Sequence, residues 1–213
     1  MAGVMALTQI FSVDRKTEFV VACSGGVDSM AVCDFYHRGG KNFKVAYFNH
    51  GTPLADSMQR HVQTWCNLNT VRLSIGNMPN RERPKKTSPE EWWRECRYNW
   101  LQSLGLPIVT AHHLNDVAET WIFTSLHGEP RLILAHNQLN RVFRPFLLNT
   151  KAQLTEWCVR HGVAWVEDLS NQDVHFPRNR IRNRILPECL EVNPGLLKVL
   201  KKKYFSSDRG VIS

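Results

Sequence analysis

Short apolar runs alternate with longer stretches of helical periodicity, and this alternation limits the possible folds more than any other feature of the chain. Four runs rich in valine, isoleucine and phenylalanine have the length of buried strands: residues 18–23, 43–50, 71–75 and 106–113. The stretches after them place apolar side chains three and four apart, as helices do: residues 27–38, 54–68, 90–104 and 114–126. Strands that alternate with helices form a parallel sheet with right-handed crossovers. We therefore predict an α/β protein with a doubly wound, mostly parallel sheet.

The regular alternation ends near residue 150. Residues 141–148 could form a further strand, and Thr150 and Gly162 have the positions of a cap and a stop for the helix between them. Ser88 has the position of a cap for the earlier helix over residues 90–104. Beyond that helix the chain becomes basic. We predict a core domain over residues 1–150 and a continuation over residues 151–213 that ends in a short, basic, helical extension.

The composition is that of a globular protein with a positive charge. The 213 residues include 27 Lys and Arg against 19 Asp and Glu, a formal net charge of +8, which favours an anionic partner, with plain solubility as the alternative. Six scattered cysteines without a C-x-x-C pair argue against structural zinc and a disulfide framework. Neither a basic leader region nor an apolar run long enough for a membrane span is present. We expect a cytoplasmic protein.

The sequence SGGVDS, residues 24–29, directly follows the first predicted strand. Open parallel sheets bind ligands at the carboxyl ends of their strands. The glycines let the backbone approach a ligand, the serines add hydroxyl donors and the next helix offers free N–H groups, so the segment predicts a phosphate cradle. It is not a Walker A loop, because no lysine follows the glycines. Asp28 would repel a bare phosphate unless Mg²⁺ lay between them. An ordinary turn capped by Ser24 is the alternative.

Further candidate residues lie on two of the predicted helices. Asp116 and Glu119 are three apart at a helix start, so both carboxylates face the same way and could hold Mg²⁺ or the ammonium group of an amino acid. An acidic first turn favoured by the helix dipole is the alternative. His112 abuts the same edge of the sheet. Arg94 and Arg97 could hold phosphates bidentately or could simply be solvated.

Basic residues gather in the last third of the chain. Arg178 and Arg182 are four apart, as are Arg180 and Arg184, so a helix would present two basic stripes. Four lysines add to this charge: Lys198, Lys201, Lys202 and Lys203. A clustered positive face is typical of a nucleic-acid partner, and a solvated surface is the alternative.

SGGVDS resembles the PP-loop of the ATP pyrophosphatases, enzymes that split ATP between its α and β phosphates and use the adenylate to activate a substrate oxygen. Five further motifs occur in the order found in one branch, the tRNA(Ile)-lysidine synthetases. They are YFNHG (residues 47–51), WRECRYNWL (93–101), AHHLNDVAET (111–120), RPFL (144–147) and the segment W-V-E-D through I-L-P (165–187). The resemblance covers about residues 18 to 195.

This resemblance implies a PP-loop fold and a ligase that adenylates the wobble cytidine of a tRNA(Ile) with a CAU anticodon. L-lysine then joins the cytidine, and AMP and pyrophosphate are released. ATP and Mg²⁺ are the implied cofactors, with Asp28 on the metal. The implied catalytic residues are Asp28, His112, Asp116 and Glu119. The implied nucleotide site comprises Ser24, Gly25, Gly26, Asp28, Ser29, His50, Arg94 and Arg97. The implied lysine and tRNA contacts are Asp116, Glu119, Arg178, Asn179 and Arg182.

The chain departs from the family pattern at several points. Asn115 stands where the family usually has an aspartate, Val117 replaces a glutamine, and the glycine-rich segment after this helix keeps only Gly128. Family members usually also have further C-terminal domains that bind tRNA. Two alternatives therefore stay open: a PP-loop enzyme with another nucleotide or tRNA substrate, and a non-catalytic tRNA-binding relic of the fold. Both a monomer and a homodimer are compatible with the sequence.

Overall fold

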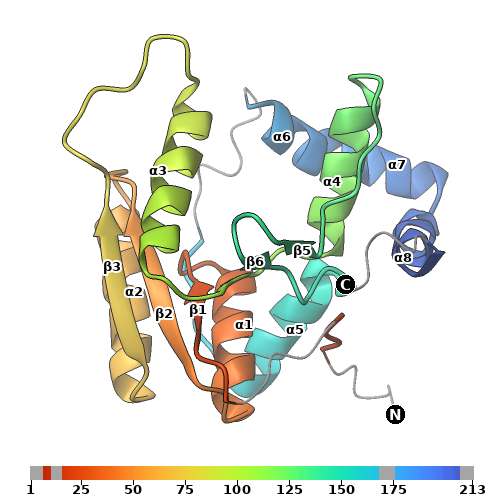
Figure 1. The fold of residues 1–213 in the computed structure, drawn as a ribbon. Coiled ribbons are helices and arrows are strands. Elements are labelled where there is room, and N and C mark those ends of the chain that lie inside the picture. The colour runs from red at the N-terminus through yellow and green to blue at the C-terminus, as the bar shows by residue number, and fades with distance from the viewer. Residues whose placement is uncertain (1–6, 11–15, 168–175, 207–213) are drawn as a thin grey trace.

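A six-stranded sheet forms the centre of the computed structural model, which describes residues 7–10, 16–167 and 176–206 (Figure 1). The strand order is β3-β2-β1-β4-β6-β5. The parallel strands are β1 (Phe19–Ala22), β2 (Phe43–Asn49), β3 (Arg72–Asn77), β4 (Ile108–Thr110) and β6 (Val142–Phe143), and the short edge strand β5 (His136–Asn137) is antiparallel to β6. The predicted doubly wound, mostly parallel sheet is confirmed.

Helices follow the strands in the predicted alternation and then continue without strands. The helices among the strands are α1 (Val27–Arg38), α2 (Ala55–Leu68), α3 (Pro89–Ser103) and α4 (Leu114–Ser125). The later elements are α5 (Lys151–His161), α6 (Pro177–Arg180), the π-helical turn η2 (Ile181–Ile185), α7 (Leu186–Val192) and α8 (Leu196–Ser206). In Figure 1 the last four lie beside α4, at the end of the chain that the sequence predicts to be basic and helical. Every helix among the described residues is too short or too polar to span a bilayer.

The two faces of the sheet are buried under different helices, as the period-2 alternation of strand side chains requires. Val21 and Val45 belong to the core cluster beneath α1, α2 and α5. Their neighbours Val20 and Ala46 point to the opposite face, where Leu101 of α3 covers them. Because both faces are buried, the strands read as continuous apolar runs. A third cluster joins α4 to η2, α7 and α8.

Helix boundaries follow the capping residues. The Ser88 hydroxyl accepts the backbone N–H of Glu91 at 3.2 Å, and Thr150 and Gln153 form a reciprocal capping box at the start of α5. Gly162 ends α5 in the left-handed conformation, with a φ of 66°. These caps are the ones that the sequence predicts. The domain boundary expected at residue 150 stays a prediction.

The strands at the β4 edge of the sheet are shorter than predicted. Residues 106–113 were expected to be extended, but only Ile108–Thr110 form β4, and His113 caps α4. Of residues 141–148, only Val142 and Phe143 pair with β4. Pro145 has no N–H to continue the ladder. The shorter strands leave His112 and His113 outside the sheet.

Gly76 is a position where only glycine fits. A Cβ atom there would lie 2.3 Å from the Trp100 indole, inside van der Waals contact. We expect Gly76→Ala to lower the free energy of unfolding by roughly 1–3 kcal/mol, because Trp100 must move to a strained position. Urea denaturation measures this loss. The matched control Asn77→Ala, at the next residue and exposed, should change stability by less than about 0.5 kcal/mol.

Candidate active site

The candidate site lies where the strand order reverses. The chain leaves β1 toward β2 on one side, and it returns from β3 through α3 to β4 on the other side of β1. The carboxyl ends of β1 and β4 therefore border a crevice, the usual ligand position in an open α/β sheet. SGGVDS follows β1, and residues 111–116 follow β4, so the two segments with the most candidate residues meet at this crevice.

The PP-loop backbone is shaped by its glycines and tied by its serines. Gly25 has a φ of +85°, and a Cβ there would also lie 3.3 Å from Val62. The Ser29 hydroxyl donates to the carbonyl of Gly26 at 2.9 Å and accepts the backbone N–H of Ser24 at 3.2 Å. Gly26 is the extended N-cap of α1, so the first N–H groups of that helix point out of it. The arrangement suits an anion with several oxygens.

His113 connects the PP-loop to the acids of α4. Its Nε2 lies 3.5 Å from Oδ2 of Asp28, and its Nδ1 lies 3.5 Å from Oδ2 of Asp116. The backbone N–H of Asp116 also donates to Nδ1 at 3.3 Å, while the Asp116 carboxylate accepts the backbone N–H of His113 at 2.9 Å. This reciprocal cap orients the buried ring so that Nε2 faces Asp28. Burial disfavours the imidazolium form, but Asp116 and Asp28 together raise the pKa of His113.

Arg182 binds both acids of α4. Its Nε and Nη2 donate to the two carboxylate oxygens of Glu119, each at 2.8 Å, and Nη2 also lies 3.1 Å from Oδ1 of Asp116. We call Asp116, Glu119 and Arg182 the acid–arginine cluster. Its bidentate geometry requires Asp116 and Glu119 to share one helix face, as their spacing predicts.

The two acids respond differently to this environment. Burial raises the pKa of Glu119, and its bond to Arg182 only partly offsets that. Burial also opposes ionisation of Asp116, but His113 and the other donors around it hold its pKa below the ordinary value. Asp116 therefore ionises more readily than Glu119, whose charge depends more on a cationic partner.

A π-helical turn presents Arg182 to the acids. Residues 181–185 form η2, which widens the helix between α6 and α7. Ile181 is buried against the α4 cluster, which places the next side chain beside Asp116 and Glu119. Single π turns occur frequently at functional sites, because they change the direction of side chains without ending a helix.

Asp28 has the properties of a Mg²⁺ ligand. Its Oδ1 is buried and has no hydrogen-bond partner among the described residues. Those residues contain no group of three His, Cys, Asp or Glu side chains arranged to hold a metal ion by themselves. Mg²⁺ is commonly bound by one carboxylate together with water and nucleotide phosphates. The Asp28 position beside the phosphate cradle therefore fits this metal.

His112 and His50 flank the site as neutral rings. The Thr110 hydroxyl lies 2.7 Å from Nδ1 of His112, and burial lowers the pKa of His112 to about 4. His50, beyond the end of β2, packs against Phe48 and Trp93, and burial beside Arg97 lowers its pKa to about 4 as well. Neither ring is charged at neutral pH.

We expect the NMR titration of His112 and His50 to show midpoints near pH 4, assigned with His112→Gln and His50→Gln. Both pKa values lie below the ordinary histidine value near 6.5, which applies to the unfolded chain. Between about pH 4 and 6.5 the two rings are therefore neutral in the folded protein but protonated in the unfolded chain. Protonation of the unfolded chain should lower stability as the pH falls from about 6.5 toward 4. Chemical denaturation across this range gives the size of the loss. Either midpoint near 6.5 would contradict the burial argument for that ring.

The remaining predicted arginines lie around the acid–arginine cluster and not within it. Arg94 and Arg97 of α3 both stack on Tyr98, at 4.9 and 5.5 Å from its ring centroid. Arg178 of α6 lies 3.9 Å from Glu90 at the start of α3. Asn179 follows it on α6. The predicted nucleotide and tRNA residues therefore fall into a central group and a surrounding group.

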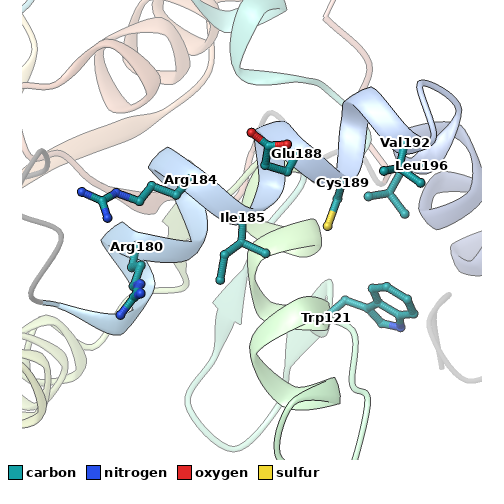
Figure 2. Close-up of a pocket in the computed structure, with 8 residues that line it drawn as sticks. All are labelled: Trp121, Arg180, Arg184, Ile185, Glu188, Cys189, Val192 and Leu196. Atoms are coloured by element: carbon teal, nitrogen blue, oxygen red, sulfur yellow. The ribbon is translucent and has the colours of Figure 1, made fainter.

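The second basic stripe points elsewhere. Figure 2 shows Arg180 and Arg184 beside an apolar hollow of about 570 Å³, with Ile185 and Cys189 on one side and Trp121 of α4 on the other. Arg182, between the two arginines in sequence, binds the acids instead. The two stripes predicted from the four-residue spacing are thus present and lie on different sides of the segment.

Some of these residues were not recognisable in the sequence. The H-x-x-D spacing of His113 and Asp116 is a capping signal, but nothing local predicts the contact of His113 with Asp28 across 85 residues. The pairing of Arg182 with both acids is equally distant in sequence. Asn115, where the family usually has an acid, accepts the backbone N–H of Lys151 at 2.9 Å, so its side chain caps α5.

Known proteins resemble this chain in sequence and in fold. Proteins named tRNA(Ile)-lysidine synthase from Haemophilus ducreyi, Lactiplantibacillus plantarum and Pectobacterium atrosepticum are 30%, 32% and 33% identical to it over 92%, 84% and 81% of its length. The chain spans 47%, 43% and 42% of those proteins, a little under half. A structure of NMN synthetase from Francisella tularensis superposes with a TM-score of 0.54 over 87% of this chain and 84% of that one, at 10% identity, which shows a shared fold.

These relatives confirm the resemblance to the tRNA(Ile)-lysidine synthetases. The model of the PP-loop domain family matches residues 4–189, most of the chain, including the glycine turn and the acids of α4. The chain belongs to the PP-loop domain family.

Proposed function

We propose that this chain is the catalytic part of a tRNA(Ile)-lysidine synthase. It would use ATP to adenylate the wobble cytidine of a tRNA(Ile) with a CAU anticodon and would join L-lysine to that cytidine. The names of its relatives support this activity, and the geometry of the crevice supports the assignment of residues. The chain spans under half the length of those relatives, so the activity is proposed for the candidate site of this chain.

The observation that supports the proposal most strongly is the position of His113. Its ring lies between Asp28, beside the phosphate cradle, and Asp116, in the acid–arginine cluster. The proposed nucleotide site and the proposed amine site are thus separated only by the His113 imidazole. A ligase of this kind needs that proximity, because the adenylated oxygen and the attacking amine must meet at one carbon.

In the first step the C2 oxygen of the cytidine attacks the α phosphorus of ATP, and pyrophosphate leaves. The PP-loop backbone and the start of α1 would hold the phosphates, and Asp28 would hold Mg²⁺, which supplies charge neutralisation. In the second step the lysine ammonium first loses a proton, the resulting amine attacks C2, and AMP leaves with the oxygen. Asp116 and Glu119 would hold the lysine at a distance that allows this attack.

The acid–arginine cluster adds a requirement to the second step. Arg182 already fills the positions on Asp116 and Glu119 where a substrate ammonium would bind. Lysine must therefore displace or share this guanidinium, and the acids remain neutralised until it does so. Without a cation, the carboxylates of the partly buried Asp116 and the buried Glu119 would repel each other.

The test is incubation of the protein with ATP, labelled lysine and a tRNA(Ile) transcript with a CAU anticodon. The proposal expects label in the tRNA together with stoichiometric pyrophosphate. Because the first step alone can release one equivalent of pyrophosphate per tRNA, repeated pyrophosphate release without label in the tRNA would indicate a PP-loop enzyme with another acceptor. Binding of the tRNA without any ATP turnover would indicate the non-catalytic relic, and either outcome rejects the proposal. A transcript with a GAU anticodon is the substrate control.

A further inference from the structure

A polar cleft separates α3 from the hairpin of β5 and β6, which face each other across the middle of Figure 1. Its volume is about 440 Å³, within the range of roughly 300–1,000 Å³ that small-ligand sites occupy. Carboxamides line much of it: Asn99 and Gln102 from α3, and Asn137 and Asn140 from the hairpin. A cleft that combines so many side-chain amides with charged groups is built for a polar ligand.

Arg144 supplies a buried cation to this cleft. Only 7% of the residue is exposed, and its Nε has no hydrogen-bond partner among the described residues. Its Nη1 donates to the carbonyl of Leu134 at 2.8 Å, which fixes the guanidinium in place. A buried guanidinium costs free energy, and an anionic group in the cleft would offset part of that cost. Arg94 lines the same cleft and adds a second guanidinium, so the cleft offers two cations to a phosphate group.

The other lining groups suit a nucleobase. Amide side chains both donate and accept, which is what the edge of an unpaired base requires. Glu91 and Glu95 also line the cleft and would repel a second phosphate, but a carboxylate accepts well from an exocyclic amino group. A nucleotide would then place its phosphate against the arginines and the amino group of its base against the glutamates.

The cleft lies beside the candidate active site and is separate from it. Phe143 of β6 pairs with Val109 of β4, so the next residue, Arg144, lies beside the end of β4 that leads to His112. Yet Asp28, His112 and Asp116 are not among the residues that line the cleft. A nucleotide bound there would therefore not be the one that reacts but would lie next to it along the strand.

We propose that this cleft binds the nucleotide adjacent to the reacting cytidine in a single-stranded RNA loop. Arg144 and Arg94 hold its phosphate, and the carboxamides and Glu95 contact a base that carries an amino group. The inference rests on the proposed function, because an RNA loop is the substrate there. It adds a subsite that selects the sequence context of the modified base.

The test measures binding of a fluorescein-labelled anticodon stem-loop with a CAU triplet by fluorescence anisotropy, without ATP. An abasic residue replaces, in turn, the nucleotide on either side of the cytidine. For the native chain, one of these two replacements should weaken binding roughly tenfold. The double variant Gln102→Ala/Asn140→Ala should bind the intact loop roughly tenfold more weakly and should no longer respond to that abasic position.

Asn42→Ala is the matched control, an exposed carboxamide at the amino end of β2, and should behave as the native chain does. Thermal unfolding of each variant confirms that the fold is retained. Equal binding of the intact and both abasic loops by the native chain overturns the inference, as does undiminished base discrimination in the double variant. Lysine incorporation is measured separately, so an inactive protein that still discriminates the adjacent base supports the cleft while rejecting the proposed ligase.

Discussion

Asp28→Asn is expected to reduce pyrophosphate release by roughly a hundredfold to a thousandfold, the usual effect of removing one group that stabilises transition-state charge. The carboxylate has a buried oxygen without a partner, and its other oxygen faces Nε2 of His113. An amide of the same size keeps the volume but loses the charge that would hold Mg²⁺ beside the phosphates. Stopped-time assays of pyrophosphate at saturating ATP give the rate.

Stability should change little in this variant, because the side chain is partly exposed and its size is preserved. The control Glu156→Gln removes an acid from α5 that pairs with Arg160 on the same helix, and it should leave turnover unaltered. Full turnover by Asp28→Asn would remove Asp28 from the proposed nucleotide site.

Arg182→Met should lower the free energy of unfolding by about 2–3 kcal/mol at pH 7, less than a fully buried pair would lose, because Arg182 is 32% exposed. The substitution leaves Asp116 and Glu119 close together without a cation. Burial already raises the pKa of Glu119, and loss of Arg182 raises it further. Protonation of Glu119 then relieves the repulsion, so the loss should be smaller at pH 5 than at pH 7. Urea denaturation at the two pH values measures both.

A second variant separates charge from packing. Glu119→Gln/Arg182→Met removes one charge of each sign, and it should recover most of the stability at pH 7, because no uncompensated acid pair remains. Arg180→Met, two residues earlier and exposed beside the apolar hollow, should have no comparable effect. An equal loss at both pH values would show that the arginine stabilises the fold through packing alone.

The parts of the fold that follow from the sequence are those determined by neighbouring residues. The strands of the sheet centre are apolar on both faces, and Ser88, Thr150 and Gly162 mark helix ends by local chemistry. The lengths of β4 and β6 do not follow, because they depend on which residues of two distant segments pair. Propensity makes residues 106–113 extended, whereas tertiary context ends the strand at Thr110.

The same distinction applies to the candidate site. The shared face of Asp116 and Glu119 follows from a three-residue spacing on one helix. Their neutralisation by Arg182 depends on a π turn, and the four-residue spacing of the arginines gives no indication of that turn. The Asp28–His113 contact depends on the register of β1 against β4, where Val21 pairs with Val109. Long-range register is a property of the assembled sheet.

The attachment of Arg182 has a consequence for how the site opens. Asp28 lies in the first turn of α1 and His113 caps α4, and these helices follow β1 and β4 at the centre of the sheet, so separating the two residues would disturb the sheet itself. Arg182 extends from η2, which is anchored to α4 by the buried Ile181 and by the ion pairs themselves. Segments with few buried contacts unfold locally at a fraction of the global free energy. We therefore expect amide hydrogen exchange to be faster in η2 than in β1. We also expect the exchange rate of η2 to change when lysine binds to Asp116 and Glu119, because lysine binding would then shift a local opening equilibrium.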